Sequence, residues 1–113
     1  MKAILYCSLL ITLTACSYPK IQQAPPIGKQ LSFQRNKGNC LACHIIEDGT
    51  DPGNIGPALT NIQTRFKNKA ALKAVIWDAT QFTPQTSMPP FGKNKILTPD
   101  ELNYVVDYIW SLN

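Results

Sequence analysis

The chain has 113 residues, which is enough for one domain and too few for two. Eleven Lys and Arg against seven Asp and Glu give a net charge of +4, far from the dense basic surface of a nucleic-acid-binding protein. Nine prolines and six glycines predict many loops, but an apolar content of 44% excludes wholesale disorder. We therefore expect one small, loop-rich domain with no nucleic-acid partner.

Residues 1–15 have the pattern of a signal peptide. Lys2 supplies a positive start, and Ala3–Ala15 is a largely apolar run of 13 residues. A membrane-spanning helix needs roughly 20 such residues, so the run is too short to cross a bilayer. The sequence Leu13-Thr14-Ala15-Cys16 then resembles a bacterial lipobox.

A lipobox predicts that Cys16 carries a lipid and becomes the new N-terminus. Leu13 fits the small-residue rule of an ordinary cleavage site poorly, which favours lipidation over ordinary secretion. We expect the mature chain to be anchored on the periplasmic side of a bacterial membrane, and Ser17 favours the outer membrane. A soluble periplasmic protein is the alternative.

The segment after Cys16 predicts a flexible tether over residues 16–28, because Tyr18–Gln30 holds three Pro, three Gln and little apolar periodicity. The folded domain is then residues 29–113, small enough to need a disulfide, metal or cofactor for stability. We place a first helix around Lys29–Asn39. Its pattern is poor, so this placement depends partly on the family resemblance given below.

The string Cys40-Leu41-Ala42-Cys43-His44 has the C-x-x-C-H spacing of covalent haem c attachment. The two thiols add to the two haem vinyl groups, and His44 follows at the position that presents an imidazole to the iron. A structural zinc site needs four ligands, and the mature domain offers no second Cys pair or His. A redox dithiol is expected beside a βαβ pattern, which this sequence lacks.

Elimination predicts the other iron ligand. His44 is the only histidine, so two histidines of one chain cannot ligate the iron. Met1 leaves with the signal peptide, and Met88 is then the only methionine, in a loop stiffened by Pro89 and Pro90. Lysine ligation, an open site and a core-filling Met88 are the alternatives. A His/Met pair raises the reduction potential and leaves no vacant position, which favours electron transfer.

Gly56-Pro57 follows His44 by about a dozen residues. In c-type cytochromes a Gly-Pro at this position places a carbonyl against the ligating imidazole, and such a contact fixes the ring orientation. We therefore expect Pro57 to belong to the haem site. A plain turn is the alternative.

Two further helices are predicted. One begins near Asn68, ends before Pro84 and carries Leu72, Val75, Ile76 and Ala79 on one stripe. The other opens with the capping box Thr98-Pro99-Asp100-Glu101. Its apolar positions Leu102, Val105, Val106, Ile109 and Trp110 share one helical face. No stretch alternates with period two for long, so the fold is expected to be all-α.

Exposed charges and aromatic side chains leave two interpretations open. We expect the aromatic residues Trp77, Tyr104, Tyr108 and Trp110 to pack in the core or at the haem edge, with an electron relay as the alternative. Lys37, Lys93 and Lys95 lie beside the predicted haem residues. They either steer an acidic partner or serve solubility.

The ordered set of motifs resembles the SoxX family, the monohaem cytochrome c subunits of bacterial Sox thiosulfate-oxidation systems. The C-x-x-C-H string alone is typical of any c-type cytochrome, whereas the full set is more specific. The matching stretches are Lys37–His44, Pro52–Pro57, Ile76–Ala79, Met88–Gly92 and Ile96–Ile109.

This resemblance implies a class I cytochrome c-like fold with one haem c attached to Cys40 and Cys43 and ligated by His44 and Met88. It implies a heterodimer with a SoxA-like c-type cytochrome. That complex, an L-cysteine S-thiosulfotransferase, couples thiosulfate oxidatively to a cysteine of the carrier SoxY. The present chain would be its electron-accepting subunit, with no active site of its own, and would pass electrons to a downstream cytochrome. Cys16 departs from the family, whose members are commonly soluble.

Three other functions stay open at this point. A stand-alone membrane-tethered cytochrome c that donates electrons to a terminal oxidase would use the same four haem residues. A gas sensor would have Met88 displaced by its ligand, and a dithiol protein would carry no haem. An independent enzyme is not expected, because no acid–base pair or nucleophile cluster accompanies the motif.

Overall fold

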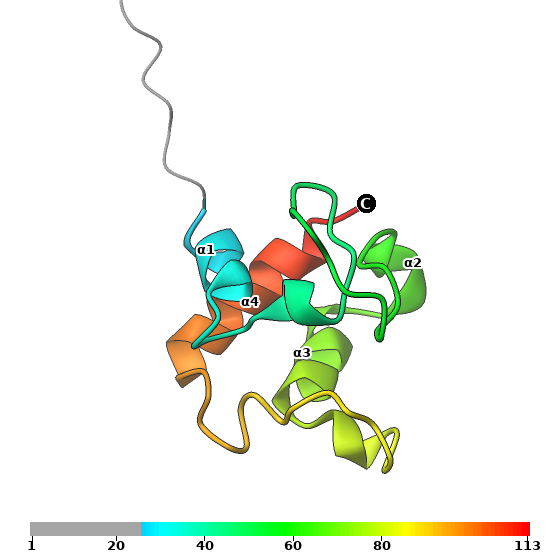
Figure 1. Ribbon diagram of the computed structural model, residues 1–113. Helices are drawn as coiled ribbons and strands as arrows, with labels where there is room; N and C mark the ends of the chain where they lie inside the picture. The colour runs from blue at the N-terminus through cyan, green and yellow to red at the C-terminus, as the bar shows by residue number, and fades with distance from the viewer. Residues whose placement is uncertain (1–25) are drawn as a thin grey trace, which may run out of the picture.

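The computed structural model describes residues 26–113, and this part of the chain contains helices and loops but no strand (Figure 1). The predicted all-α class is therefore confirmed. The elements in order are α1 (Ile27–Phe33), the 3-10 turn η1 (Cys40–Ala42), α2 (Ile62–Arg65), α3 (Lys69–Trp77), the 3-10 turn η2 (Ala79–Gln81) and α4 (Pro99–Trp110).

The predicted signal peptide, the lipidation site Cys16 and residues 16–25 of the predicted tether lie outside the described residues. Within residues 26–113, no helix combines the length and the apolar character that a membrane crossing requires.

Helix α4 begins as its sequence predicts. The Thr98 hydroxyl accepts a hydrogen bond from the Glu101 amide at 3.2 Å, and the Glu101 carboxylate accepts one from the Thr98 amide at 2.9 Å. Pro99 occupies the first turn, where its missing N–H costs nothing. The predicted apolar face is buried at Leu102, Val105, Val106 and Ile109.

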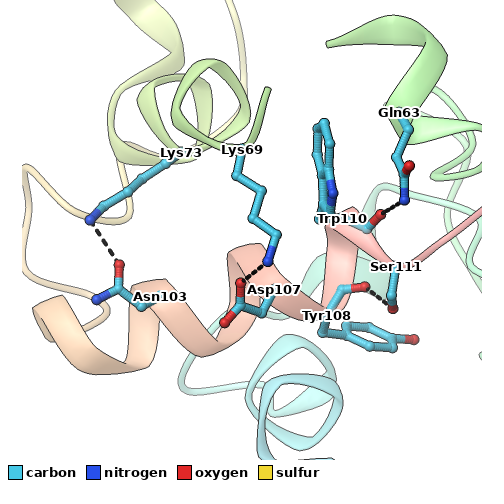
Figure 2. A network of polar contacts seen from close by, with 8 residues as sticks. All are labelled: Gln63, Lys69, Lys73, Asn103, Asp107, Tyr108, Trp110 and Ser111. Atoms are coloured by element: carbon cyan, nitrogen blue, oxygen red, sulfur yellow. Dashed lines mark hydrogen bonds and ion pairs between the residues drawn. The ribbon is translucent and has the colours of Figure 1, made fainter. Parts of the chain in front are cut away.

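Helix α4 packs against both α1 and α3 (Figure 1). The hydrophobic core gathers side chains of these three helices, of α2 and of the connection that precedes α4. Helix α3 starts after Asn68, whose side chain accepts a hydrogen bond from the Ala71 amide at 2.9 Å, so the predicted start is confirmed. On the outer faces, Lys69 reaches Asp107 at 2.7 Å and Lys73 reaches Asn103 at 2.8 Å (Figure 2). These polar contacts join α3 to α4 at the surface.

Helix α1 differs from its prediction at both ends. It begins at Ile27, inside the predicted tether, and ends at Phe33 instead of near Asn39. Gln34 takes an extended conformation, and the chain then folds back so that the Gly38 amide donates to the Leu31 carbonyl at 2.9 Å. This local turn ends the helix earlier than the predicted bound.

Two long connections complete the domain and carry the predicted site. Residues 43–61 join η1 to α2, and residues 82–98 join η2 to α4. The first connection contains His44 and Pro57, and the second contains Met88.

Candidate haem site

A cavity of about 800 Å³ lies between the two long connections and the core faces of α3 and α4. Its volume falls within the range of roughly 300–1,000 Å³ that small-molecule and cofactor sites occupy. The walls bring together Cys40, Cys43, His44, Pro57 and Met88, all of which the sequence singles out. Most of the remaining lining is apolar, and it includes Leu59, Ile62, Phe66, Leu72, Val75, Ile76, Phe91, Leu97, Val105 and Ile109.

The C-x-x-C-H string forms a tight turn on one wall. Asn39 precedes it with a left-handed φ of 47°, which asparagine tolerates better than most residues. The His44 amide then donates to the Cys40 carbonyl at 2.8 Å, which closes the turn. Cys40 and Cys43 are both half-buried free thiols, so neither sulfur is held in a disulfide.

Burial raises the pKa of the Cys40 thiol to about 11, although a hydrogen bond with Ser32 acts in the opposite direction. This thiol is therefore protonated at neutral pH. As a free thiol, Cys40 is therefore a weak nucleophile, because the thiolate is the reactive form.

The imidazole of His44 is oriented by the segment that follows it. Its Nδ1–H donates to the Pro57 carbonyl oxygen at 2.6 Å, and because a carbonyl only accepts, the proton lies on Nδ1. In the neutral form of the ring, Nε2 is then the nitrogen left free to bind a metal. The Gly56 amide also donates to the Cys43 carbonyl at 2.8 Å, and a side chain at Gly56 would overlap the imidazole ring.

Met88 lines the same cavity from the second connection. It is half-buried and packs against the hydrophobic core. Its amide donates to the Thr86 hydroxyl at 3.1 Å, a local turn that orders the chain just before the two prolines. The fold thus brings His44 and Met88, far apart in sequence, to the lining of one cavity.

Two exposed apolar residues of the cavity lining were not singled out in the sequence. Ile55 is 74% exposed and Phe82 is 59% exposed, one from each long connection. The local sequence does not indicate that they line a cavity, because this depends on the path of the two connections around it.

The aromatic predictions are only partly correct. Tyr108 and Trp110 pack against the core, but Trp77 and Tyr104 are exposed, and none of the four is among the residues that line the cavity. The prediction of core packing is thus confirmed for Tyr108 and Trp110. It is wrong for Trp77 and Tyr104, because they lie off the buried aliphatic faces of α3 and α4.

Two of the three lysines near the site have carboxylate partners. Lys37 pairs with Glu101 at 2.7 Å, and Lys93 pairs with Asp78 at 3.0 Å. Both lysines therefore do more than add solubilising charge. Lys95 is exposed and has a left-handed φ of 56°.

The residues on the walls fit a haem. Two thiols at the C-x-x-C spacing, an imidazole held at Nδ1, a thioether and an apolar cavity are the groups that a covalently attached macrocycle and its iron require. We call the side of the cavity formed by residues 40–57 the histidine wall. The overlap predicted for any side chain at Gly56 shows that this wall is shaped closely around the imidazole.

Comparison with known proteins agrees with this interpretation. Residues 27–113 match the cytochrome c family. A curated relative, an uncharacterized lipoprotein of Aquifex aeolicus (strain VF5), is 33% identical over 78 residues, which are 65% of this chain and 36% of that protein. The chain thus spans about a third of the length of this relative.

Among solved structures, a chain of the crystal structure of SoxXA from P. pantotrophus is similar with a TM-score of 0.68 and 25% identity. The match covers 77% of this chain and 80% of that chain. This similarity agrees with the class I cytochrome c-like fold and with the SoxX resemblance of the sequence. The chain belongs to the cytochrome c family, as a SoxX-like monohaem member that carries one covalently bound haem c with its iron.

Proposed function

We propose that the chain is the electron-accepting subunit of a SoxAX-type complex. In this proposal, Cys40 and Cys43 hold the haem through thioether bonds, and His44 and Met88 are the two axial ligands. The haem supplies a one-electron redox centre when bound. Pro57 keeps the imidazole in one tautomer and orientation, and the apolar lining keeps water from the cavity.

The observation that carries this proposal is the similarity to a chain of SoxXA over four fifths of that chain's length. The position of His44 and Met88 on the lining of one cavity supports it, because two protein ligands leave no vacant site for a substrate on the iron. Such a centre receives and passes on electrons. The sulfur chemistry would then belong to a SoxA-like partner, with a carrier of the SoxY type and a downstream cytochrome as transient partners.

We also propose that a lipid at Cys16 anchors the complex on the periplasmic side of a bacterial membrane. The lipobox supports this location, and so does the name of the Aquifex lipoprotein. Replacing Cys16 by Ser is expected to move the protein from the membrane fraction to the soluble fraction. A wild-type protein that is already soluble would contradict the anchor.

The experiment that tests the function is an affinity pull-down of tagged protein from thiosulfate-grown cells of the native host. We expect a near-stoichiometric second c-type cytochrome, seen by haem staining and mass spectrometry, and haem reduction that depends on thiosulfate and the carrier. A lone monohaem protein that exchanges electrons with an oxidase but ignores thiosulfate would overturn the proposal. That result would favour a stand-alone electron carrier.

The ligand assignment has its own test in the variant Met88→Ala. We expect the wild-type ferrous protein to resist carbon monoxide and the variant to bind it, with the reduction potential lower by on the order of 0.1 V. Haem should stay attached, because both thioether cysteines are intact. A wild-type protein that binds carbon monoxide readily would favour the gas sensor instead.

A further inference from the structure

Asp78 is a buried carboxylate outside the cavity lining. Its side chain is only 1% exposed, and it directly follows Trp77, the last residue of α3. Burying a charged group is costly unless other groups satisfy it. The groups that satisfy Asp78 therefore indicate which part of the structure depends on it.

Three of its contacts are local and one is distant. The Thr80 amide donates to Oδ1 at 3.1 Å, and the Thr80 hydroxyl and the Gln81 side chain add two further hydrogen bonds. The ammonium of Lys93 contacts Oδ2 at 3.0 Å from 15 residues further along the chain. Together these contacts lower the pKa of Asp78 to about 2, so the carboxylate is charged at neutral pH.

Trp77 also contacts the segment around Lys93, through its backbone carbonyl and through its indole ring. Its carbonyl accepts hydrogen bonds from the Gly92 and Lys93 amides, both at 3.2 Å. Its indole lies so close to Gly92 that a side chain there would overlap the ring. The dipeptide Trp77-Asp78 therefore contacts Gly92-Lys93 through backbone hydrogen bonds, a packed ring and an ion pair.

The N-terminal end of the loop that contains Met88 is also fixed, directly after Trp77-Asp78. The amides of Phe82 and Thr83 donate to the Ala79 carbonyl at 3.1 and 2.9 Å. Residues 79–93 thus form a loop whose two ends meet beside Trp77-Asp78, and Met88 lies within this loop. The only ion pair that closes the base of this loop, within residues 26–113, is Asp78 with Lys93.

We propose that Asp78 is a positioning residue for Met88: by pairing with Lys93 it keeps the base of the loop closed and so keeps the Met88 sulfur on the iron. This inference rests on the proposed role of Met88 as the sixth ligand. Loss of the pair would leave the haem and His44 in place, but would let the Gly92-Lys93 end of the loop separate more readily from α3.

The test measures the dissociation constant of imidazole for the ferric, haem-loaded protein. Imidazole takes the sixth position only when Met88 leaves it, so its affinity reports how readily the loop opens. In Asp78→Asn the Thr80 contacts remain possible but the Lys93 charge loses its partner, and we expect imidazole to bind about tenfold more tightly. The thioether-to-iron charge-transfer absorption should weaken in parallel.

Lys93 provides a second variant and a rescue. Its side chain is 60% exposed, so Lys93→Met should fold even where Asp78→Asn does not. We expect Lys93→Met to raise imidazole affinity about tenfold, because it leaves the buried carboxylate unpaired. Lys93→Arg keeps the ion pair and should stay within about twofold of wild type.

A matched control is the exposed ion pair between Lys69 and Asp107, at 2.7 Å across α3 and α4 (Figure 2). Asp107→Asn removes a carboxylate of the same length but lies away from the loop, so imidazole affinity should not change beyond about twofold. A purely structural role of Asp78 would lower the free energy of unfolding while leaving imidazole affinity and the charge-transfer band at their wild-type values.

The outcomes separate this inference from the proposed function. If Met88→Ala leaves the wild-type spectrum unchanged, Met88 is not a ligand, and both the ligand assignment and the inference fall. If Met88 is a ligand but Lys93→Met binds imidazole like wild type, the inference alone is overturned. Tighter imidazole binding in Lys93→Met, with Asp107→Asn unchanged, supports it.

Discussion

The two walls of the cavity hold their predicted iron ligands in different ways. On the histidine wall, the ligand lies one residue after Cys43 and 13 residues before its hydrogen-bond acceptor Pro57. The contacts that orient the imidazole are formed within residues 40–57. On the methionine wall, formed by residues 79–93, Met88 lies in the middle of a loop whose ends meet at Trp77-Asp78. Its side chain packs against the core, and within residues 26–113 no hydrogen bond holds its sulfur.

This difference predicts unequal rigidity. The imidazole is oriented directly by a 2.6 Å hydrogen bond and by the backbone of Gly56, and attachment of the haem at Cys40 and Cys43 would add to that. Met88 is placed indirectly, through the base of its loop. The histidine wall should therefore hold the haem, while the methionine wall sets how easily the sixth position opens.

The largest effect is expected from crowding the histidine wall. In Gly56→Ala the new methyl group overlaps the His44 imidazole, and the Gly56 amide is itself bonded to Cys43, so neither side yields easily. We expect the yield of haem-loaded protein to fall about tenfold or more, measured by haem staining against total protein. Gly49→Ala is the control, since its methyl group meets only the flexible end of Leu41. Equal yields for both variants would show that the wall is not closely shaped around the ring.

A smaller effect is expected from crowding the methionine wall. In Gly92→Ala the methyl group overlaps the Trp77 indole and strains the two amide contacts to the Trp77 carbonyl. Overpacking of this kind costs about 1–3 kcal/mol, so imidazole should bind the ferric protein roughly tenfold more tightly while haem content stays at the wild-type level. Loss of haem together with the tighter binding would mean that the two walls are not independent.

Acid should act on the methionine wall through Asp78. Its pKa of about 2 in the folded protein is below the value of about 3.9 for an unfolded Asp, so the carboxylate stabilises the fold above pH 4. This contribution is lost as the pH falls from about 4 to 2. We expect the free energy of unfolding to fall less steeply over this window in Asp78→Asn than in wild type, as measured by denaturant titration. Parallel curves would show that Asp78 is not ionised preferentially in the folded state.

The smallest effect concerns the segment just after the loop. Lys95 has a φ of 56°, which a lysine adopts at a cost but an asparagine tolerates. Lys95→Asn should therefore raise the free energy of unfolding by up to about 1 kcal/mol. Lys67→Asn is the control, because Lys67 is exposed and has no left-handed φ. A stability gain of equal size in both variants would assign the effect to charge.

The parts of the fold that depend on local sequence could be predicted, and α4 is the clearest case. Its capping box lies within four residues and its apolar face repeats with the helical period, so neither needs information from the rest of the chain. The bounds of α1 could not be predicted in the same way. The helix ends at Phe33 because Gln34 is extended and Gly38 bonds back to Leu31, a local turn that the helical periodicity does not encode.

The site likewise contains some residues that the sequence marks and others that it does not. His44 is marked by its motif and Met88 by elimination, since the only other methionine, Met1, belongs to the predicted signal peptide. Pro57 was expected from its likeness to c-type cytochromes, and the structure places its carbonyl against the imidazole. The pair of Asp78 with Lys93 had no signal, because the two residues lie 15 positions apart and most of the chain between them is irregular. Only the folded path of that loop brings them together.

Amide hydrogen exchange of the haem-loaded protein tests the difference between the two walls most directly. The Gly56 amide reports the histidine wall through its bond to Cys43, and the Gly92 and Lys93 amides report the methionine wall through their bonds to Trp77. We expect the Gly56 amide to be much more strongly protected, and imidazole to speed exchange at Gly92 and Lys93 alone. Equal protection at all three amides, with no effect of imidazole, would contradict a rigid histidine wall beside an opening methionine loop.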